Sequence, residues 1–411
     1  MNWGKLTIFL MCLFLSRPAS AQDSAPRLLA FAADDTIYTI ETTGENLHEL
    51  GAGANPVWSP DGSRLAFQRD QALWVMDADG DQQQMVAGPN VFGATYQWSP
   101  NGTYLAYQAV DPTDTFYPIG LFVVNVTEEA LSYPISENYV PWYAWNADGT
   151  QLAYVGAESR LESYPATIDV VEIDSGKRTV LSSTASSYDS VSWSPDGTQL
   201  AILKQYGEGT VLELTIQASD ASQTDTFNIS TILEDDRLVM QPQIDWRSES
   251  ILVREHTYSE GTRQSIWLVN PADGSARQIT TETYRTYVSF PHYTPELTPD
   301  GTGLYYLEIE CAEGYYSPTS YAQIMRVDLD DLAPQVIGSM GKDAACGATG
   351  SPSESWSLAP DGAQIAFGVN NVLGDDAPGY GLYVMDGDGQ NPHLLFETER
   401  LAGFDWRPDI R

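Results

Sequence analysis

The chain has 411 residues, and 56 acidic against 20 basic side chains give it a formal net charge of −36 at pH 7. A negative field of this size repels phosphate backbones and anionic lipid, so nucleic acid and a bare membrane surface are poor partners. Aromatic residues make up 11% of the chain and charged residues 18%, a balance typical of a folded protein built of strands.

Residues 1–21 have the pattern of an export signal. Lys5 supplies a positive n-region, Leu6 to Leu15 form an apolar h-region, and Ala19-Ser20-Ala21 is a small-residue cleavage site. The apolar run is shorter than the ~20 residues with which a helix spans a bilayer; an uncleaved membrane anchor is the alternative. We therefore predict an exported protein, periplasmic or extracellular, in which residues 22–411 form a single domain.

A turn motif, in its full form Trp-Ser-Pro-Asp-Gly, recurs eight times along the chain. Its copies begin at Trp58, Trp98, Trp145, Trp193, Trp246, Leu297, Leu358 and Trp406. Pro followed by Asp-Gly or Asn-Gly between two apolar runs predicts a tight turn, because Pro presets its own backbone angle and Gly adopts the left-handed conformation.

Short apolar runs follow each turn and predict strands. In the unit Ala54–Gly80 these runs are Leu65-Ala66-Phe67 and Leu73–Met76, and Asp79-Gly80 marks a hairpin into a fourth strand. The repeated unit is thus a four-stranded antiparallel meander of about 40–50 residues, the size of a propeller blade. The sequence predicts an all-β fold, a β-propeller of such blades.

The two ends of the chain complement each other. The unit from Arg27 to Leu50 lacks a first strand, whereas the tail from Leu401 to Arg411 holds a first strand and its turn and then stops. We predict that the C-terminal strand completes the N-terminal blade and closes the ring, which leaves no exposed sheet edge. The count is eight blades; seven is the alternative, because the units at Trp246 and Leu297 match the motif least well.

The pattern of residues 58–80, Trp-Ser-Pro-Asp-Gly, then Leu-Ala-Phe, then Leu-Trp-Val-Met-Asp-Ala-Asp-Gly, resembles the PD40 (WD40-like) repeat of TolB-type β-propellers. The resemblance extends over essentially all of residues 22–411 and implies a propeller that serves as an export-side binding platform. TolB-type proteins also carry an N-terminal α/β domain and a six-bladed propeller, whereas residue 27 of this chain already belongs to a predicted strand. Similar repeats occur in prolyl-oligopeptidase-type enzymes, but the chain contains no Gly-x-Ser-x-Gly nucleophile motif.

The links between second and third strands are often long, and in a propeller they share one face with the connections between blades. The long links are Asp111–Gly120, Gly156–Ala166, Lys204–Thr210, Arg254–Gln264, Glu310–Ala322 and Gly368–Gly381. Insertions on one face of a repeat protein commonly mark its binding side, and Tyr and Trp are typical of recognition surfaces. The predicted binding face is acidic and holds Tyr117, Tyr164, Tyr258, Tyr315, Tyr316, Tyr321, Tyr380, Trp142, Tyr284 and Tyr287. The alternative is that these side chains pack the links down.

Two cysteines remain after the signal, Cys311 and Cys346. In an exported protein they predict one disulfide, which would fix the Glu310–Ala322 link. The alternative is two unpaired thiols in separate loops.

The sequence shows no clear metal or catalytic motif. Its four histidines lie in different units, whereas zinc sites draw on spaced clusters. The run Asp77-Ala-Asp-Gly-Asp81 is similar to a calcium loop but lacks the required Gly and Glu spacing, so we predict a hairpin turn and no cofactor, with calcium as the alternative. Asp245, Glu296 and Asp405 precede motif positions on first strands, where they would either be separate and solvated or share protons or a cation.

We predict an exported, non-enzymatic and monomeric propeller that binds a protein or peptide segment, or a carbohydrate, on this face. A basic segment suits the net charge. The alternative is a propeller enzyme, a lyase or glycan hydrolase that uses carboxylates at the channel mouth.

Overall fold

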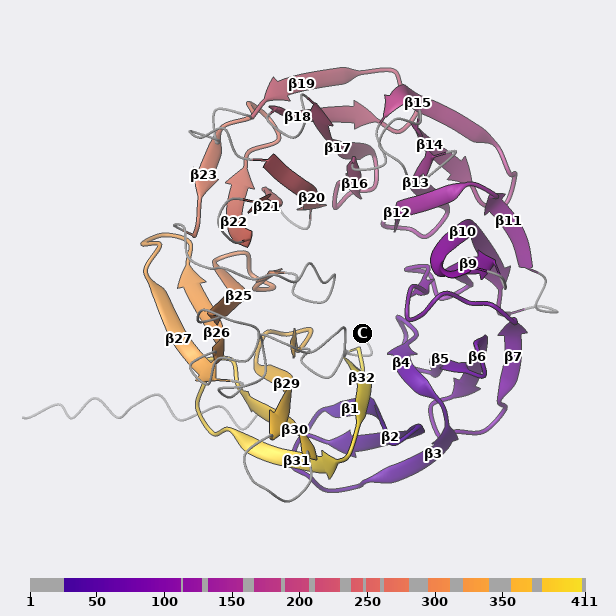
Figure 1. The fold of residues 1–411 in the computed structure, drawn as a ribbon, viewed down its shortest axis with the longest axis vertical. Coiled ribbons are helices and arrows are strands. Elements are labelled where there is room, and N and C mark those ends of the chain that lie inside the picture. The colour runs from indigo at the N-terminus through magenta and orange to yellow at the C-terminus, as the bar shows by residue number, and fades with distance from the viewer. Residues whose placement is uncertain are drawn as a thin grey trace, which may run out of the picture.

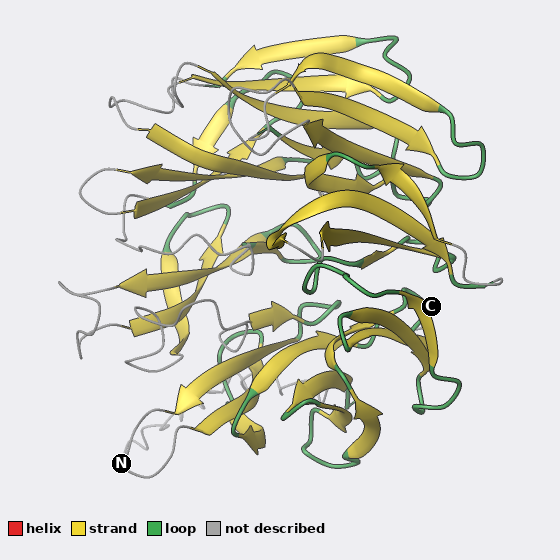
Figure 2. Ribbon diagram, turned by 45° about the vertical axis from the view of Figure 1, so that its right-hand side comes forward, coloured by secondary structure: helices red, strands yellow, loops and turns green. Residues whose placement is uncertain are grey.

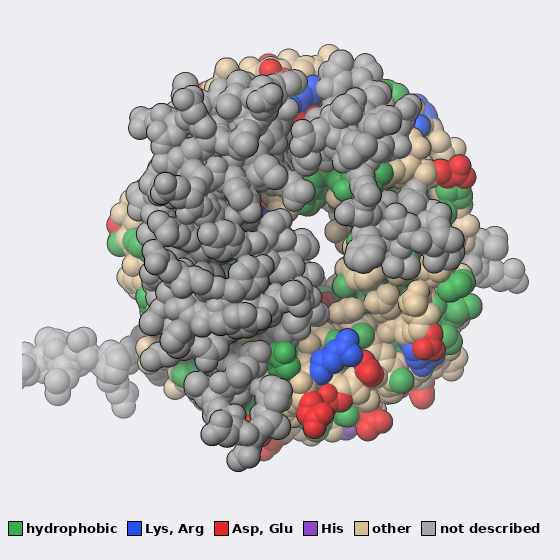
Figure 3. All heavy atoms as spheres, in the orientation of Figure 1, with side chains coloured by type: hydrophobic (Ala, Val, Ile, Leu, Met, Phe, Trp, Pro, Cys, Tyr) green, Lys and Arg blue, Asp and Glu red, His purple; other side chains and the backbone are tan. Residues whose placement is uncertain are grey.

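The structure of the protein is a computed structural model that describes residues 26–111, 114–127, 132–157, 166–185, 189–206, 211–229, 238–246, 249–258, 262–280, 295–310, 321–339, 356–371 and 379–408. In these ranges all regular secondary structure is β-strand, arranged in eight four-stranded antiparallel sheets. The sheets stand around a central hollow (Figure 1), which is open in the space-filling view (Figure 3). The predicted eight-bladed β-propeller is confirmed. The described part of the chain holds no helix long and apolar enough to cross a membrane.

Each blade has four strands, which we count from the channel outward. The first strands are β4 (Ala54–Trp58), β8 (Gln97–Trp98), β12 (Tyr139–Trp145), β16 (Ser190–Trp193), β20 (Leu238–Trp246), β24 (Glu296–Leu297), β28 (Trp356–Leu358) and β32 (Leu401–Trp406). The second strands are β1 (Leu28–Ala33), β5 (Arg64–Arg69), β9 (Tyr104–Asp111), β13 (Gln151–Ala157), β17 (Gln199–Tyr206), β21 (Ile251–Tyr258), β25 (Gly303–Glu310) and β29 (Gln364–Asn371).

The outer half of each blade consists of its third and fourth strands. The third strands are β2 (Thr36–Glu41), β6 (Ala72–Asp77), β10 (Asp114–Asn125), β14 (Ala166–Glu172), β18 (Val211–Ala218), β22 (Thr262–Val269), β26 (Tyr321–Asp328) and β30 (Gly379–Asp386). The fourth strands are β3 (His48–Ala52), β7 (Gln84–Ala87), β11 (Ser132–Ser136), β15 (Arg178–Ala185), β19 (Thr224–Asn228), β23 (Ala276–Gln278), β27 (Pro334–Ser339) and β31 (His393–Thr398).

The ring closes as the two chain ends predicted. Strand β32 pairs with β1, so one sheet has the order β3-β2-β1-β32 and joins the C-terminal to the N-terminal unit. Leu29 pairs with Trp406 in this register, and Phe31 with Phe404. The two weak units, those of β20 and β24, each form a complete four-stranded sheet, which excludes the seven-bladed alternative.

The motif makes its turn through side-chain hydrogen bonds to the backbone. In the turn between β4 and β5, the Ser59 hydroxyl donates to Asp61 Oδ1 (2.7 Å) and accepts from the Arg64 N–H (2.9 Å). Gly62 lies at φ +65°, a conformation in which glycine is not strained. These contacts close the chain reversal without using any residue from another blade, so the motif specifies the turn locally.

The same hydrogen bonds recur in other blades. Between β16 and β17 the Ser194 hydroxyl donates to Asp196 (2.6 Å), and between β8 and β9 the Ser99 hydroxyl donates to Asn101 (2.7 Å). The run from Asp77 to Asp81 forms the hairpin between β6 and β7, with Gly80 at φ +90°.

Apolar side chains pack between neighbouring blades. Ala30 and Ile37 of the closing blade form one buried cluster with Trp58, Leu65 and Phe67 of the next blade. A second strand has a blade on either side, which is why both of its faces are apolar and the alternation of large residues with Ala allows close approach. Each blade is therefore stabilised mainly by its neighbours.

The meander gives the ring two different faces, which we call the turn face and the loop face. The turn face carries the first–second and third–fourth turns; the loop face carries the second–third links and the connections between blades. Figure 2 shows the blades obliquely, turned by 45° from the view of Figure 1, with the strands running between the two faces.

Two of the predicted long links are mostly strand. Strand β10 already begins at Asp114, and β21 and β22 continue until Tyr258 pairs with Thr262. The predicted links Asp111–Gly120 and Arg254–Gln264 are thus too long, because aromatic and β-branched residues at the hairpin ends continue the pairing.

Candidate functional site

The wall of the central channel is built from the residue that directly precedes each motif copy. In ring order these channel positions are Val57, Gln97, Ala144, Ser192, Asp245, Glu296, Ser357 and Asp405. Successive side chains of a strand point to opposite sides of its sheet. The Trp or Leu side chain that opens each motif therefore packs toward the preceding blade, and the channel position meets the following blade.

Hydrogen bonds between blades follow this alternation. The Trp193 indole N–H donates to the carbonyl of Ala144 in the preceding blade (2.9 Å), and Trp406 donates in the same way to Ser357 (3.1 Å). In the other direction, the Ser192 hydroxyl accepts from the Trp246 backbone N–H of the following blade (2.9 Å). The innermost strands do not pair with one another as a sheet, and these contacts connect them instead.

Like Ser192, two acidic residues at channel positions accept a hydrogen bond from a backbone N–H of the following blade. Asp405 Oδ2 accepts from the Trp58 N–H (2.8 Å), and Glu296 Oε2 accepts from the Leu358 N–H (3.3 Å). Asp405 borders the channel but protein surrounds its carboxyl, and this burial raises its pKa to about 7. The negative charge of Glu296 adds to the rise in pKa, while the backbone N–H donors act against it.

From the sequence, Asp245, Glu296 and Asp405 would either be separate and solvated or share protons or a cation, and these contacts show how two of the three lie. Glu296 and Asp405 influence each other electrostatically, but each carboxylate is directed at a backbone N–H of the next blade. Among the described residues no three His, Cys, Asp or Glu side chains are placed so that they could hold a metal ion.

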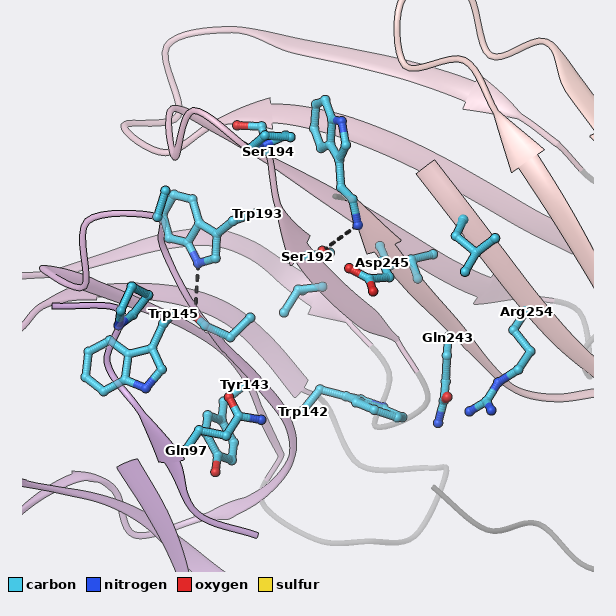
Figure 4. A pocket seen from close by; sticks show the side chains of 18 of the residues that line it. Gln97, Trp142, Tyr143, Trp145, Ser192, Trp193, Ser194, Gln243, Asp245 and Arg254 are labelled. Atoms are coloured by element: carbon cyan, nitrogen blue, oxygen red, sulfur yellow. Dashed lines mark hydrogen bonds between the residues drawn. The ribbon is translucent and has the colours of Figure 1, made fainter. Parts of the chain in front are cut away.

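A cavity of about 530 Å³ lies against the channel wall, within the usual size range of ligand pockets. It is lined by first strands of neighbouring blades, including β12, β16 and β20, and by Arg254 of β21. In Figure 4 the side chain of Gln243 lies between those of Trp142 and Arg254, with Asp245 and Ser192 beside them. The cavity thus combines an aromatic surface, amide and hydroxyl groups and two opposite charges.

Arg254 is the unusual member of this lining. Only 3% of its surface is exposed, and desolvation lowers its pKa to about 10, so the guanidinium is still charged at neutral pH. It pairs with Gln243 in the register of β20 and β21. At the equivalent second-strand position Gln68 donates to the carbonyl of Val91 in the connection to the next blade (3.3 Å).

Of the predicted binding-face residues, the structure describes the side chains of Trp142 and Tyr380. Trp142 lies in β12, packs partly against the neighbouring blade and lines the cavity. Tyr380 lies in β30 and packs against the core next to the closing blade, which agrees with the packing alternative for this residue.

The other predicted residues lie partly or wholly outside the described part of the chain. Tyr117, Tyr258 and Tyr321 are placed by their backbone only, in β10, β21 and β26. Tyr164, Tyr284, Tyr287, Tyr315, Tyr316, Cys311 and Cys346 fall outside the described residues, so the tyrosine cluster and the disulfide stay predictions.

Gln243 and Arg254 were not singled out from the sequence. A signal was present, because Arg254 follows the apolar run Ile251-Leu-Val253 at a position where other units have Gln68, Val155 or Leu203. A charge at a repeat position that is elsewhere apolar or an amide suggests a special environment.

The chain shares sequence features with one protein family. The model of the dipeptidyl peptidase IV (DPP IV) N-terminal region matches residues 29–139, well under half of the 411 residues. No curated protein is similar enough in sequence to be matched to the chain.

Solved structures are similar in fold at low identity. An oligogalacturonate lyase in complex with manganese is 13% identical, with a TM-score of 0.53 over 88% of this chain and 96% of that one. Dipeptidyl peptidase 4 from Porphyromonas gingivalis is 13% identical, with a TM-score of 0.55 over 84% of this chain and 53% of that longer chain. TolB from Acinetobacter baumannii is 14% identical, with a TM-score of 0.40 over 87% and 82%. The likeness is one of fold alone: the chain is an eight-bladed β-propeller, and its overall fold is similar to that of the lyase and of the peptidase.

Proposed function

We propose that this protein is an exported, non-enzymatic β-propeller that binds a protein or peptide segment, or a carbohydrate, on its loop face. The observation that carries the proposal is the cavity at the channel wall, which extends from Trp142, Gln243 and Arg254 to residues of first–second turns such as Pro195, so that the proposed binding surface includes the channel as well as the loop face. Its lining brings Trp142, one of the predicted binding residues, together with Gln243 and Arg254 from another blade. An aromatic surface with a few convergent polar groups is the usual composition of a binding pocket.

Two further features favour binding at the loop face. In the sequence, the link and connection segments assigned to the loop face contain most of the predicted tyrosines, a residue type that provides rigid contact area with a polar tip. The net charge of −36 would also speed the approach of a basic segment at low ionic strength.

The proposal is tested by calorimetric titration of the purified protein with a defined panel: oligolysine peptides and neutral and acidic oligosaccharides. We expect at least one class to bind, and Trp142→Ala or the double change Tyr315→Ala with Tyr316→Ala to weaken that binding by about tenfold, or ~1.4 kcal/mol. The matched control is Val180→Ala, a side chain 52% exposed on the outer strand β15. Binding that neither the Trp142 variant nor the double tyrosine variant changes would contradict the proposal.

A second candidate is an enzyme that uses the channel carboxylates. The observation in its favour is Asp405, since burial raises its pKa to about 7, the range expected of a general acid at neutral pH. Turnover of a panel oligosaccharide that is lost in Asp405→Asn, and in Asp245→Asn or Glu296→Gln, would replace the binding proposal by this one.

A further inference from the structure

We infer that a pocket on the turn face binds the guanidinium group of an arginine side chain from a partner protein. The pocket has a volume of about 450 Å³ and lies between two neighbouring blades, that of β24–β27 and that of β28–β31 (Figure 1). Turns of both blades line it, together with Tyr305 of β25 and Arg326 of β26. The site is separate from the channel cavity, so the inference goes beyond the proposed function and does not depend on it.

An arginine of this protein occupies the equivalent place between two other blades. Arg64 opens β5, and its guanidinium donates to the carbonyls of Gly102 (2.9 Å) and Val126 (3.1 Å) in the following blade. Gly102 belongs to the first–second turn of that blade, and Val126 is the first residue after its third strand. The fold therefore already holds a guanidinium at such a site, supplied there by the chain itself.

The pocket lies where the residue equivalent to Arg64 has no side chain. Arg64 is the third residue after the Asp of its motif copy, and in the copy at Leu297 the third residue after the Asp is Gly303. Other second strands have a polar or aromatic side chain at this position: Tyr104, Gln151, Gln199 and Gln364. Gly303 thus leaves open the space that a guanidinium fills elsewhere.

The carbonyl acceptors are kept in the pocket. In the following blade Gly362 and Gly387 hold the positions that the two acceptors of Arg64 hold in theirs, and both line the pocket. The Gly387 carbonyl accepts from the Tyr305 hydroxyl (2.6 Å). A carbonyl oxygen has two lone pairs, so it can accept a second donor from a ligand.

Carboxylates make the pocket more favourable for a cation. Four of them line it: Asp300, Asp361, Asp386 and Asp388. Asp300 and Asp388 use Oδ1 for the hydrogen bonds of their own turns, and within the described residues neither Oδ2 has a partner. A guanidinium has five N–H donors in one plane, enough for the two carbonyls and a carboxylate together.

Other cations fit the lining less well. Among the described residues no three acidic, His or Cys side chains are placed so that they could hold a metal ion. A lysine ammonium has its three donors at one point, whereas the acceptors here belong to separate turns. Arg326 is the positive member of the lining; it lies over the Tyr305 ring, 5.8 Å from the ring centre, and in the described structure donates to neither glycine carbonyl. Its charge opposes a bound arginine, which provides a test.

The test is calorimetric titration of the purified protein at low ionic strength with acetyl-Gly-Arg-Gly-amide. The matched peptides carry lysine, or citrulline, which has the shape of arginine without its charge. We expect the arginine peptide to bind at least about tenfold more tightly than the citrulline peptide, because charge-assisted contacts are lost, and more tightly than the lysine peptide. Free L-arginine should bind more weakly than the peptide, since its carboxylate meets the acidic rim.

Gly303→Arg supplies the side chain that Arg64 provides in the other blade, and it should abolish binding of the arginine peptide. The added Cβ would lie 3.1 Å from Thr298 Cγ2, so urea unfolding must show that this variant is folded. Asp388→Asn is the independent variant and should weaken binding about fivefold, the effect of an exposed charge pair. Its matched control is Asp79→Asn, the same change at the same hairpin position, with the same bond from the backbone N–H two residues on (3.1 and 3.0 Å).

Two further variants separate this site from the channel. Arg326→Gln removes the opposing charge and should tighten binding of the arginine peptide, whereas Trp142→Ala should leave it unchanged. The inference would be overturned by equal binding of the three peptides, tighter binding of free L-arginine, full binding by folded Gly303→Arg, equal losses in Asp388→Asn and Asp79→Asn, or weaker binding in Arg326→Gln. None of these outcomes touches the proposed function, which is judged by the Trp142 and tyrosine variants.

Discussion

The turns of the ring and the wall of its channel derive from the same motif, but they differ in how strictly they repeat. The turns at Asp61 and Asp196 use the same hydrogen bonds. The position just before the motif instead varies among Val, Gln, Ala, Ser, Asp and Glu around the channel. Repetition marks residues whose task is the same in every blade, and variation marks places where individual blades have taken on their own contacts.

The channel wall therefore serves two purposes. Ser192, Glu296 and Asp405 connect adjacent blades through backbone N–H groups, whereas Trp142, Gln243 and Arg254 line a cavity. Both sets lie on first and second strands. A site on such elements is positioned more accurately than one on loops.

The largest expected effect comes from removing residues 401–411. This deletion takes β32 from β1, exposes a sheet edge and removes the buried side chains of Leu401 and Trp406. We expect loss of a cooperative unfolding transition in urea, followed by circular dichroism. Removal of residues 409–411 alone is the control and should preserve the transition. A cooperative transition of normal midpoint in the longer deletion would show that closure by β32 is dispensable.

The second-largest expected effect is a dependence of the free energy of unfolding on pH, which comes from Asp405 at the channel wall and is tested with Asp405→Asn. The pKa of Asp405 is raised in the folded state to about 7, so the folded protein holds this proton more tightly than the unfolded chain does. Its ionisation costs stability as pH rises from about 4 to about 7, by up to about 4 kcal/mol. Asn can still accept from the Trp58 N–H, and the variant should lose this decline.

The measurement is the free energy of unfolding in urea at pH 4, 6 and 8 for both proteins, and their difference should grow with pH. Asp196→Asn is the contrasting variant on the turn face, because hydrogen bonds from Ser194 and Thr198 lower the pKa of Asp196. The stabilising contribution of the Asp196 carboxylate is lost as pH falls, whereas that of protonated Asp405 is lost as pH rises. Parallel pH profiles of the wild type and Asp405→Asn would contradict the assignment.

The smallest expected effect concerns the turns. Asp61→Ala and Asp196→Ala each remove an acceptor from a Ser hydroxyl and from backbone N–H groups at an exposed turn. Each should lower stability by about 1 kcal/mol, and the two losses should agree within about 0.5 kcal/mol. Urea unfolding of both variants measures this. Clearly unequal losses would mean that the turns, like the channel wall, have become specific to their blades.

Much of the fold could be predicted from the sequence, because the information is local and repeated. The turn at Asp61-Gly62 needs only residues 59 to 64, and the complementary chain ends predicted the pairing of β32 with β1. The lengths of the links were predicted less well. Where a strand ends depends on how far its partner continues, as with Tyr258 and Thr262, and no turn residue marks that point.

The candidate site could be predicted only in part. Trp142 was identified from the sequence as an aromatic residue of a connection. Gln243 and Arg254 line the same cavity only because the ring places their blade close to that of Trp142. Asp405 shows the same limit: its position in the motif was visible, yet its raised pKa comes from the protein packed around it and from the negative charge of Glu296 in another blade.

The sequence by itself determined the structure of the blade, the number of blades and the closure of the ring. Turns, strand patterns and complementary chain ends each depend on residues within a short segment of the chain. The tertiary structure decided which side chains lie together at the channel wall. Packing brings side chains from separate blades to one cavity and desolvates them there, and the strength of a charge or hydrogen bond depends on that burial.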